Sequence, residues 1–568
     1  MNSRYLLFIV FALWGFLSQS QFYLDSNGVT IKCPLANVGD TGVVGSTTYV
    51  KVDRTTLVAS ITASPNPADV ATCCTSGIED FSSLFQARFS FNQDISHWDT
   101  ASATTMREMF RSATVFNQNI SNWDVSNVVN MRQMFREARD FNNPIGNWDV
   151  SNVRNMYEMF LQANDFNQNI GTWTTSSVTN IQRMFRRARA FNNGEAPGNS
   201  NRPLNWFTGG VNSLEQVFWE ADSFNQDIGG WDVTQVTDFT NLFYLAVRFN
   251  RPLDTWIINN TPGVNVRMRE MFNRASAFNQ DISSWDTSRV NNMREMFRLA
   301  TSFNQDIGDW DTSNVTTMFN MFQSATVFNQ DITNFDVANV AYMNGMFQNA
   351  VAFNNGEPAG SSGRPLNSWN TSNVREFFGT FDDAGSFNQD IGEWDVTSAV
   401  KFQWMFRQNA GAMTFDRDIS TWCVEHVTNP SRISAFNNNG SIRAEYLPKW
   451  GEPCGARVIL TDSDGDNILT DTETAIITAT FDRDMNNSPQ YALNGGAYTN
   501  LSPTGDPKIW TFLLDPTPLA PGQFTFTVTG TCVIGGYIYD PLAGIVDGNE
   551  TWVDSITFTI EKTPNITI

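Results

Sequence analysis

Hydrophobic and polar residues recur along most of the chain with a period of 25. One copy reads FNQDISSWDTSRVNNMREMFRLATS, at 278–302, and similar copies fill residues 78–425. Each copy has a tryptophan at the same place, which phenylalanine occupies once. These thirteen positions are Trp98, Trp123, Trp148, Trp173, Trp206, Trp231, Trp256, Trp285, Trp310, Phe335, Trp369, Trp394 and Trp422. A fixed period indicates a stack of repeats, because one short unit cannot bury its own apolar face.

Two different patterns alternate inside each unit. Between Val128 and Ala138 the apolar residues fall at helical spacing, after the capping residues Ser126 and Asn127, and predict an amphipathic helix of about two to three turns. The FNQDI half has no helical stripe and predicts short extended segments with turns. The whole predicts an α/β solenoid of about thirteen leucine-rich-like repeats. Because helices are about 10 Å wide and paired strands lie about 4.8 Å apart, we expect the stack to curve and to present a concave face.

Three repeated positions have structural explanations. Burying one tryptophan removes about 150–250 Å² from water, so the thirteen aromatic positions are interpreted as core rather than as a ladder of sugar-stacking rings. The asparagine after each Phe is expected to bond backbone groups as an internal ladder. An aspartate follows the tryptophan just ahead of the predicted helix, where the helix dipole favours a carboxylate; a cation-binding stripe is the alternative. These aspartates are Asp99, Asp124, Asp149, Asp232, Asp286, Asp311, Asp336 and Asp395.

The charge of the chain restricts its partners. It has 58 acidic and 36 basic side chains, a net charge of −22, and this balance disfavours binding to nucleic acid or to an anionic membrane surface. The arginines of MREMFRS (106–112), MRQMFRE (131–137) and MREMFRL (293–299) lie at four-residue spacing and predict a solvated face with local glutamate partners.

Three insertions interrupt the 25-residue period, at 194–203, 257–265 and 356–365. They are rich in Gly, Pro, Ser and Asn and are interpreted as specificity loops.

The N-terminus predicts export. Residues 1–20 combine Arg4, a 13-residue apolar run and a small-residue cleavage site, as in a secretory signal peptide. We therefore expect a secreted or cell-surface protein whose mature chain is not inserted in a membrane. Its cysteines then meet an oxidising compartment and are expected to pair, with the pairing of Cys33, Cys73 and Cys74 left open. With two histidines and no CxxC spacing, a zinc site is not expected.

The repeat resembles those of the BspA-like leucine-rich-repeat surface proteins, over about 350 residues. By this resemblance residues 21–77 are an N-terminal module or cap, 78–425 the solenoid and 426–455 its C-terminal cap. The resemblance also implies a disulfide between Cys423 and Cys454 in the terminal cap. Members of this family are described mainly as secreted or cell-surface proteins thought to mediate adhesion, so the resemblance implies that role without naming binding residues.

From residue 456 to 568 the repeat gives way to Thr, Val and Ile in alternating segments, which predict a β-sandwich. The predicted strands are AIITATF (475–481), KIWTFLL (508–514), QFTFTVTG (523–530) and SITFTI (555–560). The run from ARVILTDSDGDN onward is similar to bacterial Ig-like domains. Five acidic side chains suit a Ca²⁺ site, the one cofactor that the sequence indicates, although a solvated acidic turn explains them equally well: Asp462, Asp464, Asp466, Asp471 and Glu473. Cys532 has no partner in this module and is interpreted as a buried thiol.

Three classes of function fit these features to different degrees. The first is a secreted adhesion protein, whose solenoid binds a host or neighbouring-cell protein or glycan. The second is a structural surface-layer or sheath component that self-associates. The third, an extracellular enzyme acting on polysaccharide, is disfavoured, because nearly every carboxylate belongs to the repeat and no catalytic motif is present. We therefore expect an adhesion protein that is not an enzyme.

Overall fold

The computed structural model describes residues 21–63, 68–409, 414–429, 433, 435–437 and 442–451, and the backbone of the strands that follow. The chain forms two compact units, Met1–Gln280 and Asp281–Ile568. The predicted signal peptide and the five acidic side chains of the predicted calcium site lie outside the described residues.

A small mixed module opens the first unit. Strands β1 (Tyr23–Leu24) and β2 (Ile31–Lys32) pair antiparallel, and β3 (Thr41–Val44), β4 (Thr47–Lys51) and β5 (Cys73–Cys74) form a second sheet. Helix α1 (Arg54–Ala63) and the 3-10 helix η1 (Ala68–Thr72) connect β4 to β5. A disulfide joins Cys33 to Cys74, which resolves the pairing that the sequence leaves open. The bonded Cys74 lies fully buried beside Phe22 and Ile31 in the module's core.

Cys73 is a buried free thiol next to this disulfide. Burial, together with the nearby charge of Asp69, raises the pKa of the Cys73 thiol to about 11. Only the thiolate reacts with alkylating reagents, so at neutral pH we expect Cys73 to stay unlabelled by iodoacetamide in the folded protein and to react fully after unfolding in urea. Peptide mapping by mass spectrometry measures this directly. Rapid labelling of Cys73 in the native protein would contradict the burial described.

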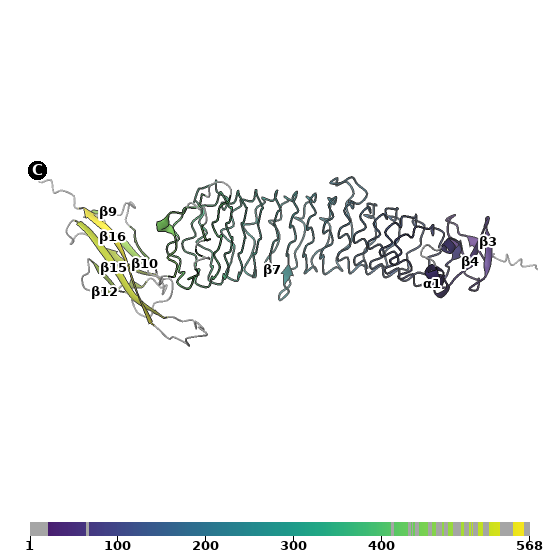
Figure 1. Cartoon of the computed structure of the whole chain (residues 1–568), viewed down its shortest axis with the longest axis horizontal. Coiled ribbons are helices and arrows are strands. Elements are labelled where there is room, and N and C mark those ends of the chain that lie inside the picture. The colour runs from purple at the N-terminus through teal and green to yellow at the C-terminus, as the bar shows by residue number, and fades with distance from the viewer. Residues whose placement is uncertain are drawn as a thin grey trace, which may run out of the picture. The chain divides into compact units, whose positions relative to one another are not determined.

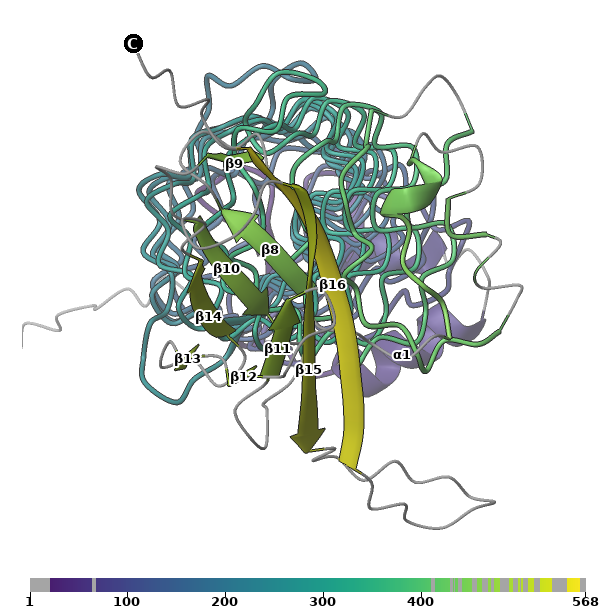
Figure 2. The same ribbon diagram turned by 90° about the vertical axis from the view of Figure 1, so that its left-hand side faces the viewer.

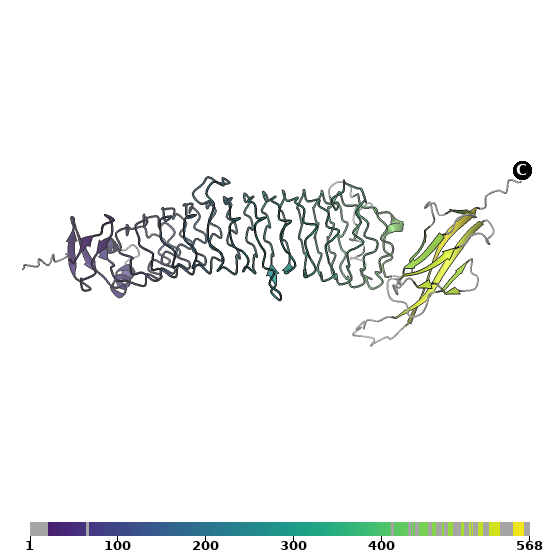
Figure 3. The same cartoon turned by 180° about the vertical axis from the view of Figure 1, so that it is seen from behind.

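Coils that run side by side make up the remainder of the first unit, and Figures 1 and 3 show them from opposite sides. Single parallel bridges link equivalent positions of neighbouring coils, for example Asp80 to Thr105 and Thr105 to Asn130. Longer strands are rare in the coils: β6 (Val266–Arg267) lies in the first unit and β7 (Val290–Asn292) in the second. Within each unit consecutive coils overlie one another when viewed end-on (Figure 2).

The predicted helix between Val128 and Ala138 is wrong. The segment consists of consecutive turns, in which Met134 donates its N–H to the carbonyl of Met131 and Ala138 donates to Phe135. The apolar spacing that resembles a helix arises because each turn directs its apolar side chain into the stack. The described coils have no helix layer, so the wide layer from which the sequence predicts curvature is absent from them.

Alternate N–H groups explain why turns replace the helix. Those of Gln133, Phe135 and Glu137 donate to the next coil, to the carbonyls of Tyr157, Met159 and Leu161 at 2.7–2.9 Å. The N–H groups between them close the turns of their own coil. A helix would direct all of its N–H groups along its own axis, four residues back, and would leave none to join the coils.

Most such segments have two residues with a positive φ, for example Gln133 at 57° and Glu137 at 60°. Each stands third in a turn, the position at which a type II turn requires φ above zero and usually takes glycine. Gly345 and Gly379 occupy this position in the second unit, at 59° and 62°. A residue other than glycine loses about 1–2 kcal/mol there. The Gln133 side chain offsets this cost by donating to Glu158 Oε2 of the next coil at 2.6 Å.

Aromatic side chains fill the centre of every described coil. The thirteen tryptophan-type positions are 0–4 % exposed. Phe110 stacks on Phe116 of its own coil at 3.9 Å between ring centroids and on Phe135 of the next coil at 5.6 Å. The indole N–H is also used: Trp148 Nε1 donates to the carbonyl of Ile120 at 3.2 Å, and Trp123 repeats this bond on Ile95. The tryptophan-type positions therefore use the indole N–H as well as the apolar bulk of the ring.

The asparagine ladder is confirmed. Each Asn Oδ1 accepts the backbone N–H of the next asparagine, as from Asn142 to Asn117 and from Asn167 to Asn142 at 2.9–3.0 Å. The same ladder continues in the second unit, where Asn329 donates to Asn304 and Asn354 to Asn329.

The second unit ends in strands. After the 3-10 helix η2 (Ala444–Tyr446), two sheets form in the orders β13-β14-β10-β8 and β12-β11-β15-β16-β9. Their strands are β8 (Arg457–Thr461), β9 (Ile468–Thr470), β10 (Ala475–Thr480), β11 (Gln490–Leu493), β12 (Thr499–Asn500), β13 (Ser502–Pro503), β14 (Ile509–Leu514), β15 (Gly522–Val533) and β16 (Asn549–Glu561). All pairs are antiparallel except β16 with β9. Cys423 is disulfide-bonded, and Cys454 lies outside the described residues.

Candidate functional site

The turn segments leave part of their side chains outside the stack, and we call this surface of the first unit the turn face. It begins with residues 107, 108, 111 and 112 and continues at the equivalent positions of each coil to residue 274. Its first row, which starts at residue 107, differs from coil to coil: Arg107, Arg132, Tyr157, Gln182, Glu215, Thr240 and Arg269. The interior instead repeats the same Met, Phe and Ala.

Ion pairs link neighbouring coils along the turn face. Arg136 Nη1 lies 2.7 Å from Glu158 Oε2, and Arg183 Nη1 lies 3.6 Å from Glu158 Oε1. Arg107 and Arg111 both reach Glu108, at 2.8 and 3.4 Å. Most of these arginines thus have the glutamate partners that the sequence predicts, although the partners stand at one, three or about 25 residues along turns rather than on a helix.

Glu158 is the most enclosed of these carboxylates, with its side chain 6 % exposed. Burial alone would raise the pKa of Glu158, but hydrogen bonds from Gln133 and Tyr157 and the charges of Arg136 and Arg183 hold this pKa below its usual value. The pKa of Glu220 is lowered in the same way, against its burial, by Trp219 and Arg187.

Acid is therefore expected to destabilise the coils. A carboxylate whose pKa is lower in the folded state contributes stability above its unfolded pKa of about 4.3, and this contribution is lost as the pH falls through the folded value. Urea unfolding of the wild type and of Glu158→Gln, at pH 7 and pH 3, measures the effect. We expect the variant to be the less stable at pH 7 and to lose less stability on acidification. An equal loss in both proteins would show that Glu158 does not contribute.

Cationic and aromatic side chains gather at one place on the turn face, and we call Arg132, Tyr157, Arg183, Arg186, Trp219 and Tyr244 the guanidinium–aromatic cluster. The Tyr157 ring lies between two guanidinium groups, with Arg132 at 5.1 Å and Arg183 at 5.9 Å from its centroid. Arg183 Nη1 also donates to Tyr157 Oη at 2.8 Å. All of these side chains are half-buried, so the rings and guanidinium planes restrict one another's movement.

The second part of the cluster is a stack. The guanidinium of Arg186 lies 4.5 Å from the Trp219 ring, and Trp219 lies 4.6 Å from Tyr244. Burial and the charges of Arg187 and Arg183 lower the pKa of Arg186, while the charges of Glu158 and Glu220 act in the opposite direction. Trp219 Nε1 donates to Glu220 at 2.8 Å, so the indole is fixed from the side as well.

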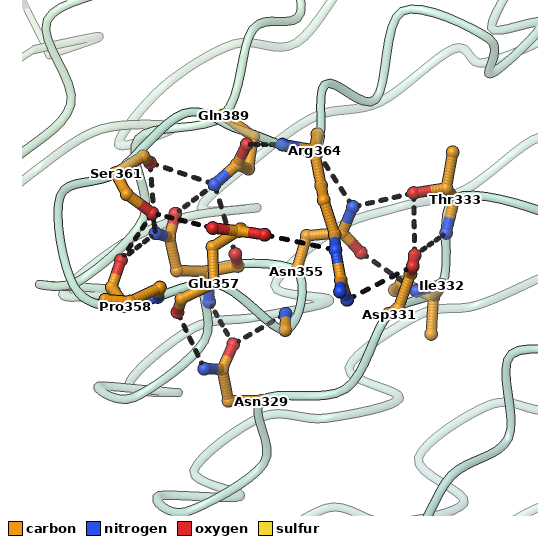
Figure 4. Close-up of polar contacts among 12 residues, drawn as sticks. Asn329, Asp331, Ile332, Thr333, Asn355, Glu357, Pro358, Ser361, Arg364 and Gln389 are labelled. Atoms are coloured by element: carbon orange, nitrogen blue, oxygen red, sulfur yellow. Dashed lines mark hydrogen bonds and ion pairs between the residues drawn. The ribbon is translucent and has the colours of Figure 1, made fainter.

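Two of the predicted specificity loops are locked by hydrogen bonds. In the loop at 356–365, Asn355 Nδ2 donates to the carbonyl of Arg364, Gln389 Oε1 accepts the Arg364 N–H, and Arg364 pairs with Glu357 at 3.1 Å (Figure 4). In the loop at 194–203 the corresponding contacts are Asn193 with Arg202, Arg202 with Gln226, and Arg202 with Glu195. The two loops are copies of one structural motif rather than single departures from the repeat, which weakens the case that they provide specificity.

The aspartates after the tryptophans do not cap helices, so this interpretation was wrong. Asp124 Oδ1 accepts the N–H of Ser126 at 3.0 Å and its hydroxyl at 2.6 Å, and Asp149 accepts the N–H of Ser151. These are turns closed by the side chain.

Phe207 takes the place of this aspartate in one coil and is 56 % exposed. It lines a shallow hollow of about 460 Å³ together with hydroxyl-bearing neighbours such as Thr174.

The described residues offer few candidates for metal binding or for histidine chemistry. Over the residues that the structure describes, no cluster of three His, Cys, Asp or Glu is placed to hold a metal ion. His97 is buried, its Nε2 lies 3.2 Å from the carbonyl oxygen of Cys73, and burial lowers its pKa. The described helices also lack a segment with the length and apolar character needed to span a membrane.

Sequence reasoning missed the guanidinium–aromatic cluster because it treated the arginines as one solvated face. The signal was present in the replacements: Tyr157, Trp219 and Tyr244 stand where neighbouring coils have arginine or other polar residues. When the coils are aligned with the insertion at 194–203 left out of the register, these changes place aromatic rings beside arginines of adjacent coils.

One family model matches the chain five times in tandem. Its description is "Mycoplasma protein of unknown function, DUF285", and the matches cover residues 56–151, 118–202, 198–266, 261–360 and 359–450. These matches agree with a repeat that runs through most of the chain. Neither a curated protein nor a solved structure matches.

Proposed function

The chain belongs to the DUF285 family of Mycoplasma proteins of unknown function, and we propose that it is a secreted or cell-surface recognition protein that adheres to its partner through the turn face. The observation that carries this proposal is the contrast between a uniform interior and a varied turn face. The interior is explained by packing and hydrogen bonds alone. The turn face places half-buried aromatic and cationic side chains at the surface, and Trp, Tyr and Arg are the residues most enriched at binding hot spots.

Several further features support a role outside the cell. Residues 1–20 have the pattern of a secretory signal, and the Cys33–Cys74 disulfide suits an oxidising compartment. The repeat also resembles that of BspA-like surface proteins thought to mediate adhesion. In this proposal the strands after residue 456 form an Ig-like module that serves as a spacer, with Asp462–Glu473 as its candidate Ca²⁺ site.

A screen of the chain without its signal, residues 21–568, on arrays of glycans and extracellular-matrix proteins tests the proposal, in Ca²⁺ and in chelator. We expect saturable binding to at least one immobilised ligand and no concentration-dependent assembly in light scattering. A blank array together with ordered assembly would overturn the proposal in favour of a structural surface-layer or sheath component. Turnover of an arrayed polysaccharide would overturn it in favour of an enzyme.

A further inference from the structure

We propose that the guanidinium–aromatic cluster binds a sulfated polysaccharide, with Arg132 and Arg186 each receiving one anionic group. This inference rests on the proposed recognition function and names the ligand class for the same surface. It starts from the ion pairs of the turn face, where Arg107, Arg136 and Arg187 all have a carboxylate partner. In the part of the chain that the structure describes, Arg132 and Arg186 have none.

Arg186 has the geometry of a prepared anion site. Its guanidinium lies over Trp219 at 4.5 Å, and contact with a ring leaves the N–H groups at the edge of a guanidinium plane free to donate. A planar fork of this kind matches the oxygens of sulfate, phosphate or carboxylate in a bidentate manner. Glu220 of the adjacent coil is already engaged by Arg187 at 3.1 Å and by Trp219.

Arg132 repeats this arrangement on a different ring. Its guanidinium lies 5.1 Å from the centroid of Tyr157, and its Nε is buried without a hydrogen-bond partner. Arg132 and Arg186 belong to coils two steps apart and to different rows of the turn face, so at about 4.8 Å per step the two anion sites are at least about 10 Å apart. Two sites at this spacing suit a linear ligand with repeated anionic groups better than one small anion.

The surface around the two guanidinium groups favours a polysaccharide. Glu215, which pairs with Arg183 and is 23 % exposed, stands in the coil after that of Arg186 and would repel a nucleic acid strand carrying a phosphate about every 3.4 Å. Sugar hydroxyl groups can instead donate hydrogen bonds to this carboxylate. The chain's net charge of −22 also opposes non-specific binding of polyanions, so the ligand must match the positions of the cations.

The test measures binding of a heparin octasaccharide to residues 21–568 by calorimetry at about 0.15 M salt. We expect saturable binding that falls at least tenfold in Arg132→Gln/Arg186→Gln. Arg186→Lys keeps the charge but loses the planar fork, so we expect an intermediate loss. The matched control is Arg267→Gln/Arg443→Gln, which removes two guanidinium groups that lie outside the turn face, are more exposed than those of Arg132 and Arg186, and are each paired with a carboxylate. This control should change affinity less than about twofold. Unchanged circular dichroism and thermal unfolding confirm that each variant is folded.

Each alternative result has a definite meaning. An equal loss in the control pair, or equal binding of chemically desulfated octasaccharide, would overturn the assigned site. Tighter binding of poly-glutamate or of a single-stranded oligonucleotide would overturn the ligand class. If the arrays give a saturable ligand while heparin does not bind, this inference fails and the recognition function stands; if neither binds, both fail.

Discussion

Replacing Trp148 by alanine is expected to destabilise its coil by about 3–5 kcal/mol, the range found for truncation of a buried tryptophan. The ring is 4 % exposed, packs against Phe135 at 6.3 Å and donates its N–H to the Ile120 carbonyl. In a stack each coil depends on its neighbours, so the loss of stability should extend to the coils on either side. Hydrogen exchange measures this loss as local opening of the coils. We expect amide protection across 120–160 to fall at least 100-fold, the equivalent of about 2.7 kcal/mol.

Val129→Ala supplies the matched control for this substitution. Val129 lies in the same part of the stack but is 41 % exposed, so its truncation should change stability by no more than about 0.5 kcal/mol. A change in protection below about threefold in Trp148→Ala would contradict the role of the aromatic ladder as core.

Replacing Asn192 by alanine is expected to cost about 3 kcal/mol or more. This side chain is fully buried, accepts the N–H of Asn225 at 2.9 Å, and donates to the carbonyls of Ala196 at 2.6 Å and Asn199 at 3.0 Å. Its loss removes these three hydrogen bonds from a buried position, each worth about 0.5–1.5 kcal/mol net. Limited proteolysis within 194–203 and hydrogen exchange at residue 225 both report the released loop.

Asn142→Ala separates burial from the hydrogen bond itself. Asn142 makes the same ladder bond, to Asn167 at 2.9 Å, but is exposed, so water can replace its side chain and we expect a cost of about 1 kcal/mol. Equal costs at the two positions would show that the bonds of Asn192 to the loop contribute little.

Much of the stack could be predicted from the sequence, because the period and the apolar positions determine which residues face inward. The asparagine ladder followed from one residue type at one place in every repeat. The helix prediction failed at Met131, Met134, Phe135 and Ala138, where helical spacing and a series of turns give the same apolar pattern. Non-glycine residues such as Gln133 gave no sign of the positive φ that the turns require.

The candidate site was less predictable, since it depends on contacts between coils. Arg186 and Trp219 are 33 residues apart because an insertion lengthens this interval, so a search at a spacing of 25 does not pair them. The free thiol likewise depends on geometry: Cys73 and Cys74 are adjacent, and only the fold determines that Cys74 reaches Cys33.

Hydroxyl-radical footprinting of residues 21–568, with and without the ligand found on the arrays, tests most directly whether the turn face is the recognition surface. The account predicts that ligand protects Tyr157, Trp219 and Tyr244 from oxidation and leaves Phe207 unchanged. Protection confined to Phe207 or to the loops at 194–203 and 356–365, with the three turn-face rings unaffected, would contradict it.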